Sequence, residues 1–266
     1  MEFIGNRHDP YSDIGMVSAQ GGKIINLTNS GYTSGFPRWV LDGNAILFIT
    51  ERYGMRAHAS WGSLNDVMLV FMNQDAYDKF RLSKEDYELQ KELEKEQKNT
   101  TEAKKNDKKK GDNKEKSEEK KEEKVKDIVV ELNNIEDRIV RLTPNSSDLG
   151  SAIITKDGET LYYLSAFEGG YDLWKMNLRK KDTKLLHKMD AGWANMEMDK
   201  DGKNLFLLGS NTMQKMGTDS ESLKPISYQA HVKMDLAAER DYMFNHVYKQ
   251  EQKRFYNLNM HGIDWD

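Results

Sequence analysis

Residues 150–188 read GSAIITKDGETLYYLSAFEGGYDLWKMNLRKKDTKLLHK, and four short strands follow one another in this stretch. We place them at 151–155, 161–165, 171–178 and 183–187. The first two are joined at Asp157-Gly158, since Asp and Gly tolerate the positive φ that a two-residue hairpin needs. Four antiparallel strands in about forty residues match the size of one β-propeller blade.

The same unit occurs elsewhere in the chain. Residues 194–210 (ANMEMDKDGKNLFLLGS) overlay 152–165 at a shift of about 44 residues, and residues 36–50 (FPRWVLDGNAILFIT) form an earlier copy. Each copy carries Asp-Gly at the same turn, at Asp42, Asp157 and Asp201. This spacing lies in the range of blade repeats and favours a propeller. The alternative is a β-sandwich that contains three unrelated hairpins.

The repeats assign most of the chain to blades. Residues 1–30 read as the end of a blade, with strands at 13–19 and 23–28, which implies that earlier blades precede it. The next blade has strands at 36–41, 45–50 and 66–72, and it resumes at 128–132 and 138–143. Residues 150–188 and 191–228 are two successive blades. In the last one, 212–222 carries little strand signal, and Pro225 is expected at an edge or turn.

A charged, low-complexity insertion at 84–127 interrupts the second blade. Its first part, 83–97, predicts a solvated helix capped by Ser83, with Glu–Lys pairs at helical spacing. Residues 99–126 have almost nothing apolar to bury, so we expect disorder there. A polyelectrolyte tail is the alternative, although the balanced charge argues against a specific basic or acidic partner.

The period changes at Asp235, which is a plausible N-cap of an amphipathic helix of about twenty residues. Its apolar side chains fall near one another on a helical wheel: Leu236, Met243, Phe244, Val247 and Tyr248. Such a helix must pack on something, so it either caps the propeller or begins a second domain. The predicted fold is therefore mainly β. A partial propeller of about three to four four-stranded blades with an incomplete ring spans 1–234, and a helical segment spans 235–266.

Composition excludes several classes of protein. The formal net charge of −4 argues against a nucleic-acid-binding protein. The chain contains no apolar run long enough to span a bilayer, and 1–20 shows no signal peptide. The absence of cysteine excludes disulfides and thiolate metal sites.

The sequence contains no catalytic constellation that we assign. It lacks a nucleophile elbow, a P-loop, a dinucleotide-binding loop and a His-Glu-x-x-His motif. Ser117 opens a Ser-x-x-Lys match inside the charged insertion, where chance matches arise. Asp199-x-Asp201-Gly202 hints at a calcium loop but lacks the later carboxylates, so a hairpin turn is favoured. The histidines are scattered and are best interpreted as turn, rim or packing residues: His8, His58, His187, His231, His246 and His261. We therefore predict no catalytic, cofactor-binding or metal-binding residue.

The blades and the C-terminal segment together resemble the tricorn protease family. The specific match is a helix that ends in a "FY–N–MHG–DW" pattern, here Phe255, Tyr256, Asn257, Met260, His261, Gly262, Asp264 and Trp265. Residues 135–138 (IEDR) and the lysine-rich insertion also resemble this family.

The resemblance implies a large cytosolic serine peptidase whose propellers form channels or filters for peptides. It also implies a PDZ-like domain and a peptidase core as further parts of the same protein, and a homo-oligomer. The nucleophile and its partners would lie beyond residue 266, so this chain alone is expected to be inactive. The alternative is a non-enzymatic propeller that binds a protein or peptide, like the propeller of the Tol system, and a periplasmic location goes with that alternative.

Overall fold

The computed structural model describes residues 2–4, 11–56, 62–93, 96, 127–210, 212–257 and 259–265. The chain divides into two compact units, Met1–Ile226 and Ser227–Asp266. Among the described residues, no helix has both the length and the apolar character needed to cross a membrane.

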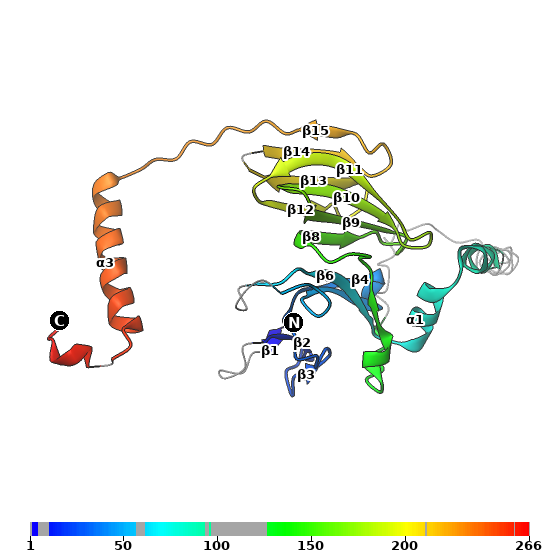
Figure 1. Ribbon diagram of the computed structural model, residues 1–266, viewed down its shortest axis with the longest axis horizontal. Coiled ribbons are helices and arrows are strands. Elements are labelled where there is room, and N and C mark those ends of the chain that lie inside the picture. Colours follow the sequence, from blue (N-terminus) through cyan, green and yellow to red (C-terminus); the bar gives the residue numbers. More distant parts are fainter. Residues whose placement is uncertain are drawn as a thin grey trace, which may run out of the picture. The chain divides into compact units, whose positions relative to one another are not determined.

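The first unit consists of antiparallel sheets that follow one another along the chain (Figure 1). The first sheet contains β1 (Glu2–Ile4), β2 (Asp13–Met16) and β3 (Ile25–Asn26). The second contains β4 (Ser34–Val40), β5 (Ala45–Thr50), β6 (Asp66–Phe71) and β7 (Ile139–Arg141). The third contains β8 (Asp148–Ile154), β9 (Thr160–Ala166), β10 (Tyr171–Asn177) and β11 (Asp182–Ala191). The fourth contains β12 (Ala194–Met198), β13 (Asn204–Gly209), β14 (Thr212–Gly217) and β15 (Leu223–Pro225).

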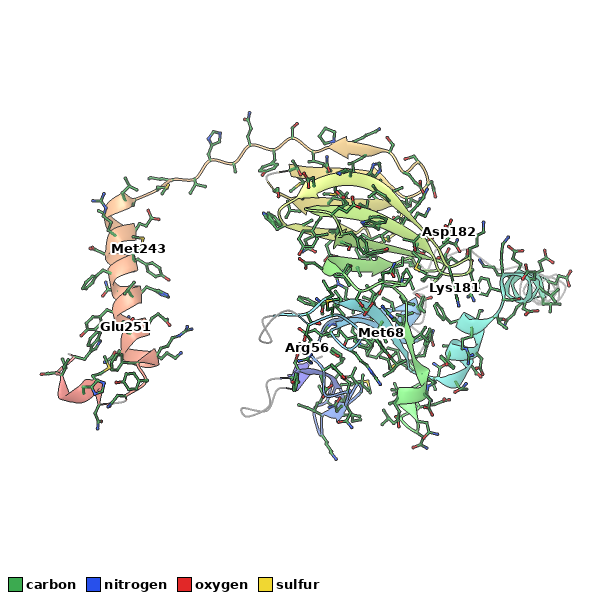
Figure 2. The ribbon with its side chains drawn as sticks, viewed as in Figure 1. Arg56, Met68, Lys181, Asp182, Met243 and Glu251 are labelled. Carbon is green, nitrogen blue, oxygen red and sulfur yellow. The ribbon has the colours of Figure 1, made fainter. Side chains whose placement is uncertain are left out.

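Each sheet pairs its strands in chain order, as the blade repeat predicts. One apolar core lies between each pair of successive sheets. Met68 of β6, labelled in Figure 2, is buried in the core between the first two sheets. The middle strands β5 and β9 are consequently buried on both faces, and each large apolar side chain there contributes roughly 1.5–3 kcal/mol. The fold is a partial propeller, and the described sheets leave its ring open.

The fourth sheet shows where the ring stays open. In β13, Leu205 and Leu207 are buried against the third sheet, whereas Phe206 and Leu208 are 36% and 41% exposed. No described sheet covers this second face.

The prediction of little strand signal at 212–222 is wrong for β14, because backbone pairing with β13 stabilises that strand despite its polar sequence. Pro225 lies in the edge strand β15, as predicted.

The Asp-Gly turns are longer than the predicted two-residue hairpins. Between β8 and β9 the loop is closed by a hydrogen bond from the Gly158 N–H to the Thr155 carbonyl, at 2.9 Å. Gly158 and Gly202 adopt φ values of 71° and 73°, which are accessible to glycine at little cost. Glycine is therefore required at this position, as predicted, but inside a wider loop.

The second sheet is completed across the insertion, where one prediction needs correction and one helix was not predicted. Residues 128–132 form no strand. The return segment is held instead by Arg138, which is buried in the short helix η3 (Ile135–Arg138) and donates to the carbonyl oxygens of Phe71, Glu131 and Asn133. A backbone hydrogen bond from the Glu131 N–H to the Met72 carbonyl oxygen, at 2.7 Å, also ties this segment to the residue that follows β6. Helix α1 (Gln74–Arg81), capped by the Asn73 side chain, was not predicted.

The predicted solvated helix at 83–97 is partly correct. Residues 84–93 are helical, and the Ser83 hydroxyl accepts the Asp86 N–H at 3.1 Å. Tyr87 is only 7% exposed, however, and the Arg179 guanidinium lies 3.9 Å from the centre of its ring. Lys91 also pairs with Glu159 at 2.7 Å. The start of the insertion thus packs on the third sheet. The predicted disorder at 99–126 lies outside the described residues.

The first sheet also differs slightly from prediction. The strands predicted at 13–19 and 23–28 are present as the shorter β2 and β3, and β1 is a further strand paired with β2. Asp13 of β2 accepts a 2.7 Å hydrogen bond from the Thr28 hydroxyl beyond β3. The first sheet therefore has β1 in addition to the two predicted strands.

The second unit contains α3 (Leu236–Arg254) and the short helix η4 (Met260–Gly262). Asp235 caps α3, as predicted, by accepting the N–H groups of Ala237 and Ala238 at 3.1 Å. Met243, which is labelled in Figure 2, is 55% exposed and so is little covered by the described residues of this unit. Arg240 and Glu251 fall on the same side of the helix at helical spacing, so the predicted apolar stripe is interrupted.

Candidate functional site

The candidate site lies where the first strands of three sheets meet. Strands β4, β8 and β12 each form one edge of their sheet, and β8 contacts β12. Two cavities are lined by residues of these strands, with volumes of about 360 Å³ (cavity 1) and 320 Å³ (cavity 2). The inner edges of the blades therefore enclose a hollow rather than packing solidly together.

The two cavities follow each other along the strands. Cavity 1 is lined by 38–43, 152–154 and 197–200, towards the Asp-Gly turns, whereas cavity 2 is lined by 36–38, 150–152 and 194–195. Arg38, Leu47 and Ala152 line both. Arg38 therefore stands at the division between the two cavities.

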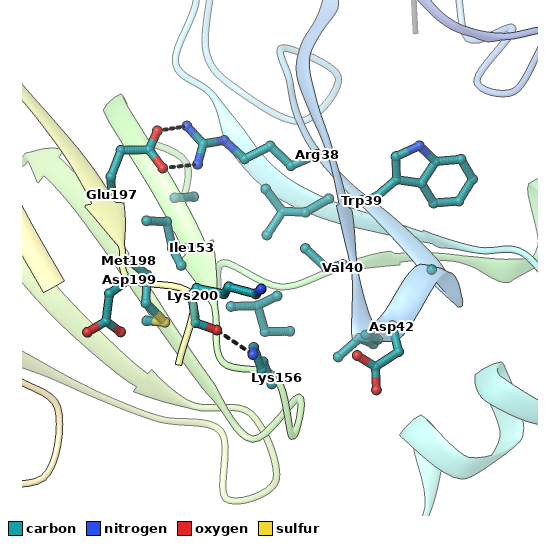
Figure 3. A pocket seen from close by; sticks show the side chains of 15 residues that line it. Arg38, Trp39, Val40, Asp42, Ile153, Lys156, Glu197, Met198, Asp199 and Lys200 are labelled. Atoms are coloured by element: carbon teal, nitrogen blue, oxygen red, sulfur yellow. Dashed lines mark hydrogen bonds and ion pairs between the residues drawn. The ribbon is translucent and has the colours of Figure 1, made fainter. Parts of the chain in front are cut away.

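Arg38 forms a bidentate ion pair with Glu197, from β4 to β12 (Figure 3). The Nη1–Oε2 and Nη2–Oε1 distances are 2.9 and 2.5 Å. The hydrogen bonds to Glu197 raise the pKa of Arg38 above its ordinary value, against the opposing effect of burial. Both side chains remain 42% and 62% exposed, so solvent screens the pair and it contributes little stability. The pair is therefore notable for its place at the division between the two cavities rather than for its contribution to stability.

The pair occupies equivalent positions of the blade repeat. Arg38, Ile153 and Glu197 each lie four residues before the Asp of an Asp-Gly turn. They form one layer across three strands, and the pair spans the strand that carries Ile153 (Figure 3). This site was not predicted from the sequence. The signal that could have found it is the opposite charge of Arg38 and Glu197 at the same position of the three repeats, once these are aligned at their Asp-Gly turns.

Cavity 1 has an apolar floor and a charged rim. The floor is formed by Val40, Leu41, Leu47, Ile153, Ile154 and Met198. At the rim, the Lys156 ammonium donates to the Lys200 carbonyl oxygen at 2.5 Å and links two neighbouring turns. The rim carries three cationic and three anionic side chains, Arg38, Lys156 and Lys200 against Asp42, Glu197 and Asp199. Their charges balance.

The Asp199 carboxylate is engaged within its own turn. One oxygen accepts the N–H groups of Lys203 and Asn204, and the other accepts the Asn204 side-chain amide. The hydrogen bond from the Asn204 side-chain amide, together with the hydrogen bonds from the backbone N–H groups, lowers the pKa of Asp199 below its ordinary value. The structure thus supports the hairpin interpretation of Asp199-x-Asp201-Gly202, because the oxygens that a cation would need are taken by the turn. Among the described residues, no group of carboxylates and histidines is arranged to hold a metal ion.

Cavity 2 is shaped by irregular strand pairing. The register between β4 and β5 shifts between Gly35 and Arg38, and the bulge contains Phe36, which has a φ of 55° and is 72% exposed. A positive φ is unusual for a bulky residue. Gly150 of β8 lies so close to β12 that a Cβ atom there would come within 2.9 Å of the Ala194 carbonyl oxygen. A second register shift, between Leu149 and Ser151, falls at the same cavity. Bulges next to functional sites commonly redirect side chains.

His187 lies outside the lining of both cavities. His187 contacts the Glu221 carbonyl oxygen at 2.8 Å, and His246 stacks on Tyr242. His231 lies between β15 and α3 and is exposed. His8, His58 and Ser117 fall outside the described residues. That the chain carries no catalytic, cofactor-binding or metal-binding residue remains a prediction.

Four of the C-terminal residues that carry the family resemblance contact one another, namely Phe255, Tyr256, Asn257 and His261. His261 contacts the Tyr256 hydroxyl through Nε2, and its Nδ1 lies 3.4 Å from the Asn257 amide. Phe255 packs edge-on against the His261 ring, and Trp265 stacks on Tyr248 of α3 with 5.2 Å between ring centres. The motif therefore stabilises the turn that follows α3.

A comparison with protein families finds a match in the C-terminal segment. Residues 236–266 match the tricorn protease C1 domain. No curated protein matches the sequence.

Among solved structures, the chain resembles the tricorn protease with a TM-score of 0.60 and 10% identity, over 95% of this chain and 23% of that chain. It also resembles TolB from Acinetobacter baumannii (TM-score 0.48, 9% identity, 82% of this chain and 38% of that chain). A puromycin-hydrolyzing peptidase of Mycobacterium tuberculosis is similar too (TM-score 0.47, 11% identity, 86% of this chain and 29% of that chain). The chain thus spans about a quarter of the length of the tricorn protease. In its fold and in its C-terminal segment, the chain is tricorn-like.

Proposed function

We propose that this chain is the propeller portion of a tricorn-like serine peptidase that degrades peptides. Its role is to channel or filter peptide substrates on their way to a catalytic centre elsewhere in the protein, and the chain alone is inactive. The observation that carries this proposal is the pair of successive cavities along β4, β8 and β12, in a chain whose last residues match the tricorn C1 domain. An extended peptide has the shape that such a passage accommodates.

The propeller and the terminal segment would then have separate roles. We assign the propeller to residues 1–234 and the beginning of the peptidase core to 235–266. A PDZ-like domain, the rest of the core and further copies of the same protein are the partners that this proposal implies. It places the protein in the cytoplasm, whereas a binding propeller without enzymatic activity would fit the periplasm.

The test is substrate size. In the natural protein that contains these residues, Asn195→Trp adds bulk to cavity 2 from an exposed position. We expect hydrolysis of a twelve-residue peptide to fall several-fold, while hydrolysis of a short chromogenic amide stays unchanged. Lys188→Trp, at an exposed position on β11 at the other edge of its sheet, is the matched control and should change neither rate. Equal effects on both substrates would contradict a channel, and the absence of any peptidase activity would favour the binding propeller.

A further inference from the structure

Cavity 1 has features that passage alone does not require. A passage needs open space, whereas this cavity has a continuous apolar floor of six side chains contributed by β4, β5, β8 and β12 and the adjoining turn. Ligand sites in proteins are typically concave and mostly apolar, with a few polar groups that fix orientation. A volume of about 360 Å³ is sufficient for one large side chain.

The polar groups at the boundary of the cavity suit a peptide main chain. Arg38 offers N–H donors and Glu197 offers carboxylate oxygens, side by side and within 3 Å of each other. In an extended chain the N–H and the C=O of one residue point to the same side, so a donor and an acceptor that lie side by side can bind both groups of that residue. Because the two side chains are partly exposed, their mutual bonds can be exchanged for bonds to a ligand at little cost.

The balance of charge in the rim indicates which side chain the cavity accepts. Three cations face three anions. Both Asp199 oxygens are already bonded within their own turn, and the Lys156 ammonium is bonded to the neighbouring turn. A charged ligand side chain would therefore gain no net attraction and would lose its hydration over the apolar floor. An aliphatic or aromatic side chain would bury apolar area there.

We propose that cavity 1 is a binding subsite for one large apolar side chain of an extended peptide, and that Arg38 and Glu197 hold the peptide main chain at its boundary. This inference rests on the proposed function and gives it a substrate class, namely peptides with a large aliphatic or aromatic residue inside the chain.

The experiment measures side-chain discrimination by the full chain. The probe is a blocked nonapeptide of Gly and Ser with a central 4-fluorophenylalanine, observed by fluorine NMR. Unlabelled competitors of the same length carry Leu, Ala or Asp at the centre. We expect Leu to compete roughly tenfold better than Ala, as a hydrophobic pocket allows, and Asp to compete least.

Two variants separate the floor from the ion pair. Met198→Trp fills the cavity and should weaken probe binding at least tenfold, with loss of the preference for Leu over Ala. Arg38→Met should weaken all competitors alike and keep their ranking. Lys188→Trp is the matched control and should bind like the unchanged chain. Near-ultraviolet circular dichroism and the thermal midpoint identify any variant that fails to fold, and in that case Val40→Trp, on the opposite wall, replaces Met198→Trp.

The outcomes decide between the two proposals. Equal competition by Leu, Ala and Asp would overturn the subsite and leave the channel in place, because the peptides would still bind. Undiminished probe binding by the cavity-filling variant that folds would overturn it as well. Equal effects of Asn195→Trp on the long and the short substrate in the hydrolysis test, with discrimination among the competitors intact here, would overturn the channel and keep the subsite.

Discussion

The Asp66 carboxylate accepts a 2.8 Å hydrogen bond from the Thr143 hydroxyl, although 77 residues, including the whole charged insertion, separate them in the chain. Asp66 is fully buried at the start of β6, and it also binds Arg141 at 2.8 Å and the Ser146 hydroxyl at 2.7 Å. A similar bond links Asp13 to Thr28 in the first sheet. An aspartate at the start of a blade strand thus fastens the loop that follows the next strand.

We predict that Asp66→Ala lowers the free energy of unfolding by about 3 kcal/mol, because it leaves buried donors without an acceptor. Asp66→Asn keeps an acceptor oxygen and should cost less. Urea unfolding measures both. A loss below about 1 kcal/mol for the alanine variant would show that water replaces the carboxylate.

We predict that deleting residues 99–126 leaves the thermal midpoint unchanged within about 2 °C, because long surface insertions cost little loop entropy. Extending the deletion to 84–126 should lower it, because Tyr87 and the Lys91–Glu159 pair would be lost. Tyr87→Ala alone should cost about 3 kcal/mol through the cavity it leaves. Aggregation of the shorter deletion would contradict the separation of the two parts of the insertion.

Stability should also depend on alkaline pH through Tyr163. Burial raises the pKa of Tyr163 from 10.0 to about 12. Between these values the unfolded phenol loses its proton while the folded one keeps it, so the free energy of unfolding falls as pH rises, by roughly 2–3 kcal/mol in total. Below pH 10 this contribution is constant. Tyr163→Phe should flatten the decline between pH 10 and 12, whereas Tyr228→Phe, at an exposed position, should leave it intact.

The strand order and the repeat could be predicted from the sequence because alternation and Asp-Gly turns are local signals. Three features could not be predicted this way. Strand β14 depends on backbone pairing with β13 rather than on its own side chains, and the segment at 128–132 is held by Arg138, so neither follows from local alternation of side chains. The Arg38–Glu197 pair joins residues 159 positions apart, and only the alignment of blades brings them together.

The strength of that pair can be measured by a double-mutant cycle. With Arg38→Ala and Glu197→Ala, we expect a coupling of about 0.5 kcal/mol at low salt that fades as salt is added, because the pair is partly exposed. The cycle uses thermal or urea unfolding of four proteins at two salt concentrations. A coupling above about 2 kcal/mol would mean that the pair stabilises the propeller itself, and exchange of its bonds for a ligand would then be costly.

The last prediction concerns α3. Within its own unit, this helix leaves Leu236, Phe244 and Val247 more than half exposed, whereas Leu161 and Leu164 in β9 are fully buried. Packing supplies most of the stability of a helix of this length, so its amides should open far more readily than those of the sheet. Hydrogen exchange of the 266-residue chain measures both regions at once. We expect residues 237–255 to exchange within the first time points and 161–164 to exchange only on global unfolding. Equal protection of the two regions would make α3 an integral part of the propeller and would move the domain boundary that we propose at residue 235.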